Sequence, residues 1–252
     1  MQHTFSRTQL LLGEAAMKTL QASRVAVFGV GGVGGYVVEA LVRSGIGALD
    51  IVDDDRVCPT NLNRQIIALH STVGQYKVDV AEARIRDINP HCRVTKHQQF
   101  YLPENADAID LSPFDYVVDC IDTVTAKLEL IRRCHALGVP IISCMGAANK
   151  MDATAFRVTD ITKTKMDPLA KVIRRKLRQL RIPRLKCVWS EEEPLQPLTP
   201  AENSPEEETG LHAKRRSIPA SNAFVPATAG LITGGEVVKD LLRKAGTYRL
   251  TT

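Results

Sequence analysis

The segment that most constrains the fold is a valine-rich run that leads into a crowded glycine loop, VAVFGVGGVGG. Residues 24–30 form an apolar run typical of a buried parallel strand, and residues 33–44 carry apolar side chains at helical spacing. The connection between them contains Gly29, Gly31, Gly32 and Gly34. Glycine lets a backbone approach a phosphate closely, and the start of a helix favours negative charge. The loop therefore predicts a nucleotide site, which holds either a redox dinucleotide or ATP.

The rest of the chain alternates between strand and helix patterns. Strands are expected at residues 48–52, 116–119, 140–144 and 155–159, and helices at residues 76–89, 125–137, 167–180 and 228–244. Short glycine-containing connections between such elements indicate an α/β fold, a Rossmann-like doubly wound and mainly parallel sheet with helices on both faces. A smaller C-terminal extension is expected to complete this fold.

Composition is that of a cytoplasmic globular protein. The 252 residues suffice for one large α/β domain with an appendage, and residues 1–20 show no secretory signal pattern. The apolar stretch at residues 223–235 is too short to span a bilayer, so no transmembrane segment is expected. The six cysteines include no C-x-x-C pair, which argues against a structural zinc and, in a reducing cytosol, against disulfides.

Asp53 follows the second expected strand, near the usual distance from the glycine loop for an acid that accepts hydrogen bonds from a ribose hydroxyl. A nicotinamide dehydrogenase would carry the same acid. Asp54 and Asp55 extend this acidic patch, and a solvated, capped loop is the alternative interpretation of these two residues.

The segment after this patch distinguishes between ATP and a redox dinucleotide as the ligand. It contains polar residues at fixed spacing, namely Asn61, Arg64, Gln65 and then Lys77. An enzyme that attacks the α-phosphate of ATP needs fixed cations and hydrogen-bond donors, since negative charge builds up on the phosphoryl oxygens and on the departing pyrophosphate. Arg64 offers a planar fork for phosphate and Lys77 a point charge. Asn61 and Gln65 add orienting hydrogen bonds. A dehydrogenase leaves these residues unexplained, so the pattern favours ATP.

A further strand end, in the sequence D-C-I-D, adds two acids. Asp122 is a candidate ligand for a Mg²⁺ ion that bridges the ATP phosphates, because this ion prefers hard oxygen donors. Asp119 is either a second functional acid or the cap of the following turn. Both are expected at the same edge of the sheet as the glycine loop.

The motifs GVGGVG, IVDDD, N-L-N-R-Q, V-G-x-x-K and D-C-I-D, in this order, resemble the adenylating superfamily of ubiquitin-activating enzymes. The match covers roughly the first 145 residues. It implies that residues 1–150 form an ATP-binding, adenylating domain with an N-terminal helical arm. It also implies a homodimer, ATP with Mg²⁺ and a monovalent cation as a further candidate, and activation of a carboxylate as an acyl-adenylate.

The same resemblance implies a role for individual residues. It assigns Asp53 to the ribose, Asp122 to the metal, and phosphate contacts to Asn61, Arg64, Gln65 and Lys77. Asp55 is counted with this nucleotide site. In many members of the superfamily an arginine near the N-terminus reaches ATP in the partner subunit, and Arg7 is the matching residue here. Whether Arg7 acts across a dimer or within its own subunit stays open.

Further motifs resemble the tRNA threonylcarbamoyladenosine dehydratases over nearly the whole chain, among them R-S-G-I-G, I-R-D-I-N-P, V-T-D-I-x-K-T, D-P-L-A-K and C-V-W-S-E-E-x-P. This resemblance implies an ATP-dependent enzyme of the ligase class, whose substrate is tRNA with threonylcarbamoyladenosine beside the anticodon. ATP would adenylate the threonine carboxylate, and the carbamoyl group of the same nucleoside would attack the acyl carbon. AMP would leave, which closes a ring with net loss of water and gains from proximity.

Residues 161–186 form a basic segment with Asp167 as its only acid. The candidates for neutralising tRNA phosphates are Lys171, Arg174, Arg175 and Arg178, with Lys163, Lys165 and Lys176 beside them, and a solvated helix face is the alternative. Cys187 is expected either to line the site or to be a buried structural thiol. Residues 151–252 would form the C-terminal extension, with this segment, a mobile acidic loop within residues 190–210 and a closing helix that packs on the same sheet.

Two other function classes stay open. One is an activator of a small sulfur-carrier protein ending in Gly-Gly, for which a sulfur-relay or carrier protein would be the partner. The absence of C-x-x-C pairs weakens this alternative, because such activators often hold zinc between two of them. The other is a nucleotide-sensing scaffold that binds ATP without turnover.

Overall fold

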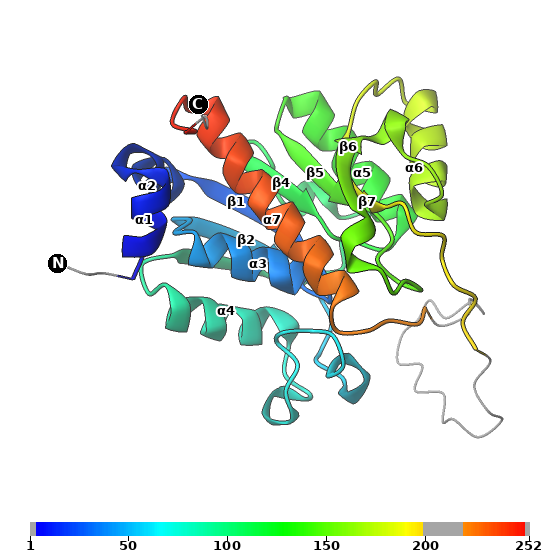
Figure 1. Ribbon diagram of the computed structural model, residues 1–252, viewed down its shortest axis with the longest axis horizontal. Helices are drawn as coiled ribbons and strands as arrows, with labels where there is room; N and C mark the ends of the chain where they lie inside the picture. The colour runs from blue at the N-terminus through cyan, green and yellow to red at the C-terminus, as the bar shows by residue number, and fades with distance from the viewer. Residues whose placement is uncertain (1–3, 199–218, 250–252) are drawn as a thin grey trace.

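The computed structural model describes residues 4–198 and 219–249, in which a seven-stranded sheet carries helices on both faces (Figure 1). The strands are β1 (Arg24–Phe28), β2 (Ala48–Val52), β3 (Arg93–His97), β4 (Tyr116–Asp119), β5 (Ile141–Cys144), β6 (Phe156–Asp160) and β7 (Lys186–Ser190). Their order in the sheet is β3-β2-β1-β4-β5-β7-β6. Neighbouring strands are parallel except for β6, which runs antiparallel to β7. The predicted doubly wound, mainly parallel sheet is confirmed.

The helices pack in two layers. They are α1 (Ser6–Leu12), α2 (Glu14–Ala22), α3 (Gly34–Arg43), α4 (Lys77–Ile88), α5 (Val124–Leu137), α6 (Pro168–Gln179) and α7 (Val225–Lys244), with short 3₁₀ helices at Pro59–Asn61, His70–Thr72, Ala106–Ala108, Ala153–Ala155 and Ile161–Lys163. Side chains of β1 alternate between the two faces of the sheet. Val27 packs in the core that α2, α3, α4 and α7 cover, whereas Phe28 packs with Leu130 of α5 on the other face. The α6 helix lies on the α5 side, over β7.

The closing helix is part of the core. α7 packs beside α3 and crosses the sheet (Figure 1), and Val225, Ala229 and Val237 are fully buried there. Within the described ranges, no helix is both long and apolar enough to cross a bilayer.

Two strands were not expected from the sequence. β3 is an edge strand in which Arg93, Thr95 and Lys96 are exposed, so it has no apolar run that would reveal it. β7 is almost entirely buried. Its residues belong to the C-V-W-S-E-E-x-P motif and were interpreted only through that family motif, so no strand was predicted there. Because β7 pairs with β5 and β6 with β7, the described part of residues 151–252 continues the same sheet. A domain boundary at residue 150 stays a prediction.

Part of the predicted loop region lies outside the described residues. The acidic, proline-rich stretch predicted to be a mobile loop runs from residue 190 to 210, and its part from residue 199 onward is not described.

A buried ion pair joins the carboxyl ends of β4 and β5. The Lys127 ammonium, which is fully buried on α5, lies 2.7 Å from an oxygen of Asp119 and donates hydrogen bonds to the Ser143 hydroxyl and the Cys144 carbonyl. Ser143 also donates to Asp119. The other Asp119 oxygen accepts from the Ile121 amide at 3.1 Å, so of the two interpretations of Asp119 the capping one fits the structure. All donors of the ammonium are therefore satisfied, and the two strand ends are held together.

Replacing Lys127 with Met is expected to lower the free energy of unfolding by about 3–5 kcal/mol, because Asp119 becomes an uncompensated buried charge. Urea unfolding followed by circular dichroism measures the change. The matched control is Lys18→Met, which removes the exposed partner of Glu14 and should leave the unfolding midpoint almost unchanged. Equal effects of the two substitutions would contradict the structural role of the buried pair.

Candidate functional site

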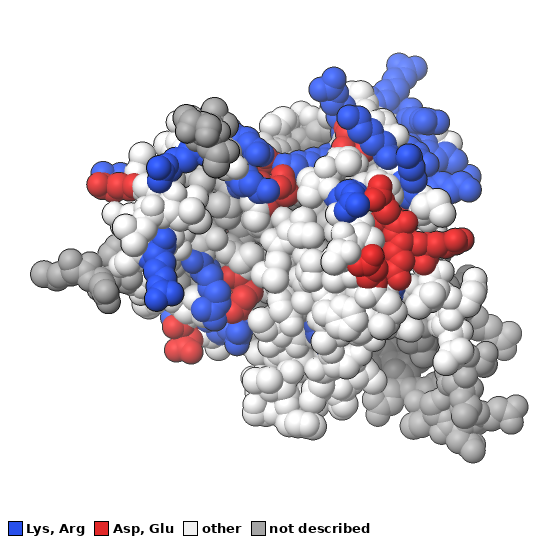
Figure 2. Space-filling model, in the orientation of Figure 1, with Lys and Arg blue, Asp and Glu red and all other residues white. Residues whose placement is uncertain are grey.

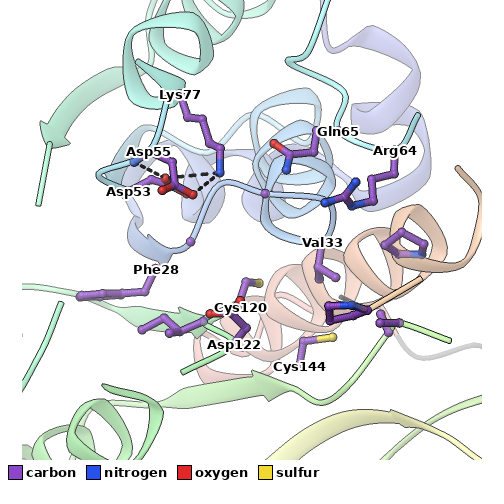
Figure 3. Close-up of a pocket in the computed structure, with 18 of the residues that line it drawn as sticks. Phe28, Val33, Asp53, Asp55, Arg64, Gln65, Lys77, Cys120, Asp122 and Cys144 are labelled. Carbon is purple, nitrogen blue, oxygen red and sulfur yellow. Dashed lines mark hydrogen bonds and ion pairs between the residues drawn. The ribbon is translucent and has the colours of Figure 1, made fainter. Parts of the chain in front are cut away.

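A cavity of about 500 Å³ lies at the carboxyl ends of the parallel strands (Figure 3). This is the usual volume and the usual place for a small-molecule site in a doubly wound sheet. The structure brings ten of the residues predicted for the nucleotide site together on its walls, namely Gly29, Gly31, Gly32, Asp53, Asp55, Asn61, Arg64, Gln65, Lys77 and Asp122.

The glycine loop depends on two close approaches. Gly29 has φ +87°, and a Cβ atom at this position would lie 2.8 Å from the Cys120 carbonyl oxygen. A Cβ atom at Gly34 would lie 1.7 Å from the Gly29 carbonyl oxygen, which no side chain could tolerate. Gly34 does not line the cavity; it lets the first turn of α3 sit against the loop. The helix N-terminus is thereby aimed at the cavity, where it favours an anion.

Asp53 ties the loop to the end of β2. One carboxylate oxygen accepts from the Val30 amide at 2.7 Å, and the other accepts from the Asp55 amide at 3.0 Å. Burial raises the pKa of the Asp53 carboxyl, and the charge of Lys77 opposes this effect. Each oxygen keeps acceptor capacity for a further donor such as a ribose hydroxyl.

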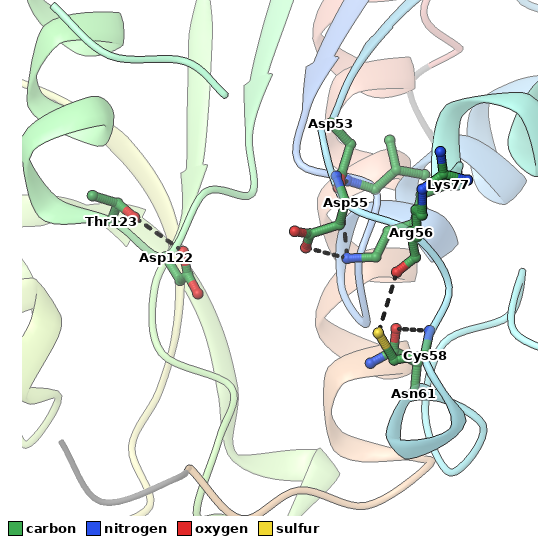
Figure 4. A network of polar contacts seen from close by, with 9 residues as sticks. Asp53, Asp55, Arg56, Cys58, Asn61, Lys77, Asp122 and Thr123 are labelled. Carbon is green, nitrogen blue, oxygen red and sulfur yellow. Dashed lines mark hydrogen bonds and ion pairs between the residues drawn. The ribbon is translucent and has the colours of Figure 1, made fainter. Parts of the chain in front are cut away.

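Lys77 is a buried cation beside the acidic patch. Its ammonium lies 2.6 Å from an oxygen of Asp55 and 3.8 Å from one of Asp53, as the dashed lines in Figures 3 and 4 show. The backbone holds it in place, because the Lys77 amide donates to the Asp55 carbonyl at 3.0 Å. The guanidinium of Arg56 also stacks on Tyr76, 3.6 Å from the ring centre, just before α4 begins.

Arg64 is a half-buried cation that has no acidic partner within the described residues. Its guanidinium donates to the Thr60 carbonyl and to the Asn63 side chain, each at 2.9 Å. Burial lowers the pKa of Arg64. Figure 3 shows its side chain beside the glycine loop, near Gln65. A desolvated guanidinium without a carboxylate is a ready site for phosphate.

The 3₁₀ helix before Arg64 positions the side-chain amides of Asn61 and Gln65. Asn61 is buried and its side-chain oxygen accepts from the Cys58 amide at 3.1 Å (Figure 4). The side-chain oxygen of Gln65 is buried without a hydrogen-bond partner in the described part of the chain. Buried polar atoms are nearly always paired, so this oxygen can accept a hydrogen bond from a donor on a ligand in the cavity.

Carboxylates stand on two sides of the cavity. Asp122 is exposed after β4 and accepts a hydrogen bond from the Thr123 hydroxyl at 3.3 Å, whereas Asp53 and Asp55 lie opposite it in Figure 4. Ligand atoms of Asp53, Asp54 and Asp55 all lie within 4.8 Å of one another, the one such acidic group found in the described residues. These oxygen donors fit a hard cation such as Mg²⁺ that also contacts phosphates.

Two predicted site residues lie away from the cavity. Arg7 is exposed on α1, and the neighbouring Phe5 packs near Gly45, in the turn that precedes β2. This turn is at the amino ends of the strands, opposite the cavity. Cys187 does not line the site as one interpretation expected: it is fully buried in β7 against α6, and burial raises its pKa to about 12. The alternative interpretation, a buried structural thiol, fits this position.

The predicted tRNA-binding residues lie on α6, outside the cavity. Ala170, Ile173 and Leu177 form its buried side, and the exposed basic side chains are Lys171, Arg175, Lys176 and Arg178, which gather on one surface in Figure 2. Arg174 is half-buried and donates to the Thr164 carbonyl at 2.7 Å, so it is engaged within the fold.

The first turn of α6 touches the cavity rim. Asp167 caps the helix by accepting from the Ala170 amide, and it also pairs with the buried Lys150 at 3.3 Å. The next residue but one, Leu169, lines the cavity. The basic surface therefore begins beside the cavity.

Sequence reasoning missed the segment after β3. Gln99, Phe100 and Tyr101 line the cavity, as do Met145 to Ala148 after β5. The exposed pattern of β3 gave no strand end from which the first three could have been placed.

Comparisons with known proteins agree with this geometry. The model of the ThiF family matches residues 5–249. A tRNA threonylcarbamoyladenosine dehydratase of Bacillus subtilis is 47% identical over 244 residues, which cover 96% of each chain. The solved structure of the Escherichia coli tRNA N6-threonylcarbamoyladenosine dehydratase in complex with AMP superposes with a TM-score of 0.85 at 34% identity, covering 96% of this chain and 95% of that one.

The activators of sulfur carriers match less of the chain. The molybdopterin-synthase adenylyltransferase of Escherichia coli is 36% identical over 145 residues, which is 57% of each protein. The resemblance to the dehydratases, in contrast, extends along nearly the whole chain. The chain therefore belongs to the ThiF family, and its similarity to the tRNA threonylcarbamoyladenosine dehydratases of that family is confirmed.

Proposed function

We propose that this protein is an ATP-dependent enzyme that cyclises threonylcarbamoyladenosine in tRNA. The observation that carries the proposal is the cavity in which the glycine loop, the half-buried Arg64 and the buried Lys77 meet at the strand ends. A phosphate chain placed there would face two cations and the start of α3. The dehydratases of Bacillus subtilis and Escherichia coli, which match along nearly their whole length, support the substrate.

The first step forms an acyl-adenylate. One oxygen of the threonine carboxylate attacks the α-phosphorus of ATP, and the bond to the β-phosphate breaks with release of pyrophosphate. Arg64 and Lys77 stabilise the charge that develops on the phosphoryl oxygens and on the leaving group. Asn61 and Gln65 orient the phosphates by donating hydrogen bonds from their side-chain NH2 groups. Asp122 would hold Mg²⁺, which would supply further positive charge to the phosphates.

The second step closes the ring. The carbamoyl group attacks the acyl carbon and loses a proton, and AMP departs with one of the original carboxylate oxygens. The nucleoside has then lost the elements of water. Both reacting groups belong to one nucleoside, so the enzyme gains the effective concentration of an intramolecular reaction.

The assembly that fits this chemistry is a cytoplasmic homodimer. Arg7 lies at the amino ends of the strands, away from its own cavity, so a catalytic Arg7 would have to serve the cavity of a partner subunit. A monovalent cation beside Mg²⁺ completes the proposed cofactors. No sulfur-relay or carrier protein is needed for the cyclisation itself.

The basic surface of α6 is proposed as the tRNA-binding surface. Lys171, Arg175 and Arg178 are exposed and have no ion-pair partner among the described residues, whereas Arg174 donates to the Thr164 carbonyl within the fold. A phosphate backbone along this helix would place the modified nucleoside near Leu169 and hence at the cavity rim.

Pyrophosphate release from Mg·ATP is expected only in the presence of tRNA that carries threonylcarbamoyladenosine, with loss of one water from the nucleoside by mass spectrometry. Arg64→Ala should lower the turnover number by about 10²–10³, because one fixed donor to the developing charge is removed. Arg86→Ala is the matched control, since Arg86 is exposed on α4 and pairs with Glu82. Release that depends on a small Gly-Gly-ended protein, and not on modified tRNA, would instead favour a sulfur-carrier activator.

Reversing charge on the exposed side of α6 is expected to weaken tRNA binding. The triple variant Lys171→Glu, Arg175→Glu, Arg178→Glu should lower the slope of log affinity against log salt by about 0.7–0.9 for each tRNA phosphate that the protein no longer neutralises. ATP binding without tRNA should not change. The control triple, Lys18→Glu, Arg86→Glu and Lys244→Glu, makes the same change in net charge at exposed positions elsewhere. Equal salt slopes for the two triples would remove α6 as the tRNA surface.

A further inference from the structure

Gln99 lines the nucleotide cavity and has a buried side-chain nitrogen without a hydrogen-bond partner among the described residues. Neither the sequence motifs nor the comparisons assign it a role. A buried amide N–H that lacks an acceptor is rare in folded proteins, because its desolvation is not compensated. An orphaned donor in the wall of a ligand cavity therefore indicates an acceptor atom on the ligand.

The position of Gln99 along the sheet edge identifies which part of the ligand it meets. β1, β2 and β3 are parallel neighbours, so the segments that follow them lie side by side. The Gly29 amide donates to the Val52 carbonyl at 2.8 Å, and the Asp53 amide donates to the His97 carbonyl at 3.2 Å. Gln99 comes two residues after His97.

The segments after β1, β2 and β3 follow one another along this edge in the same order as the phosphate, ribose and base of a nucleotide. The glycine loop after β1 is the phosphate end, and Asp53 after β2 is the ribose end. Gln99, after β3, lies one strand farther, and two strand spacings span about 10 Å. A nucleotide with its phosphates on the glycine loop and its ribose at Asp53 thus extends its base toward Gln99.

The surroundings of Gln99 suit a base. Val52, which pairs with His97 of β3, and Tyr101, two residues after Gln99, also line the cavity. Flat apolar surfaces with one amide are the usual means by which a protein holds a base and reads its edge.

The segment that carries Gln99 is held rigidly. The backbone N–H of Gln99 donates to the His97 carbonyl at 3.0 Å, and the Asn105 side chain donates to the Phe100 carbonyl at 2.6 Å. Tyr101 is buried, and its ring and that of Phe28 form a T-shaped pair with 4.9 Å between ring centres. With the backbone fixed in this way, only the side-chain torsions of Gln99 remain to be ordered when a ligand binds.

We propose that the amide of Gln99 reads the base of ATP and selects adenine over guanine. A primary amide pairs with adenine by donating to a ring nitrogen and accepting from the 6-amino group. Guanine carries a 6-oxo group in place of that amine, so the same pair of hydrogen bonds cannot form. A two-bond contact of this kind discriminates roughly 10- to 100-fold. The inference rests on the proposed function only in that ATP is the nucleotide bound.

The test is equilibrium binding of ATP and GTP to the full chain, by calorimetry and without tRNA. The wild-type protein should prefer ATP about 10- to 100-fold. Gln99→Met keeps the side-chain size but removes the amide; it should weaken ATP binding by a similar factor and leave GTP binding nearly unchanged. The matched control is Gln98→Met, since Gln98 is the exposed neighbour and does not line the cavity.

A second probe tests the contact itself. Purine riboside triphosphate lacks the 6-amino group, so it should bind the wild-type protein more weakly than ATP does, and Gln99→Met should no longer distinguish the two. Unchanged selectivity in Gln99→Met would overturn the inference. Equal weakening of ATP and GTP would overturn it too, because that result marks a structural effect, which thermal melting detects independently. Failure of the proposed function would look different: ATP binds with the same selectivity, but modified tRNA elicits no pyrophosphate.

Discussion

The carboxylate of Asp53 joins the segments on which the nucleotide cavity depends. It accepts the Val30 amide of the glycine loop at 2.7 Å and the Asp55 amide at 3.0 Å, and the ammonium of Lys77 lies 3.8 Å away. Because the group is almost entirely buried, these interactions are stronger than they would be in water. The loop, the end of β2 and the start of α4 are thereby fixed relative to one another before any nucleotide arrives, which is the condition for electrostatic catalysis.

The residues that follow β4 and β5 form a second fixed wall of the cavity, and α6 begins beside the cavity opening. The Lys127–Asp119 pair holds the ends of β4 and β5, and Cys120 and Met145, just beyond these ends, both line the cavity. The buried pair of Lys150 and Asp167 sets the start of α6 at the rim. The fold thus places the nucleotide cavity between fixed walls, and the basic helix α6 begins beside its opening.

The sequence predicted the elements for which hydrophobic pattern, glycine positions and residue order agree. β1, the glycine loop and α3 follow from an apolar run, glycines and helical spacing, and the polar set from Asn61 to Lys77 followed from its order after the loop. β3 could not be predicted, because an edge strand with exposed Thr95 and Lys96 has no apolar period, and Gln99 was missed with it. Cys187 lies in a recognisable motif, but the motif does not show the direction of its side chain. The alternation of side chains along β7 places Cys187 against α6, away from the cavity.

The proposed reaction depends on transfer of the adenylyl group to the threonine carboxylate, and an isotope experiment tests this transfer most directly. Modified tRNA with ¹⁸O in both carboxylate oxygens is cyclised with unlabelled Mg·ATP, and the products are identified by mass spectrometry. The proposed chemistry predicts AMP with one ¹⁸O atom, because the bridging oxygen of the acyl-adenylate departs with it, and unlabelled pyrophosphate. Label in inorganic phosphate with ADP as the nucleotide product, or label only in water, would contradict an acyl-adenylate.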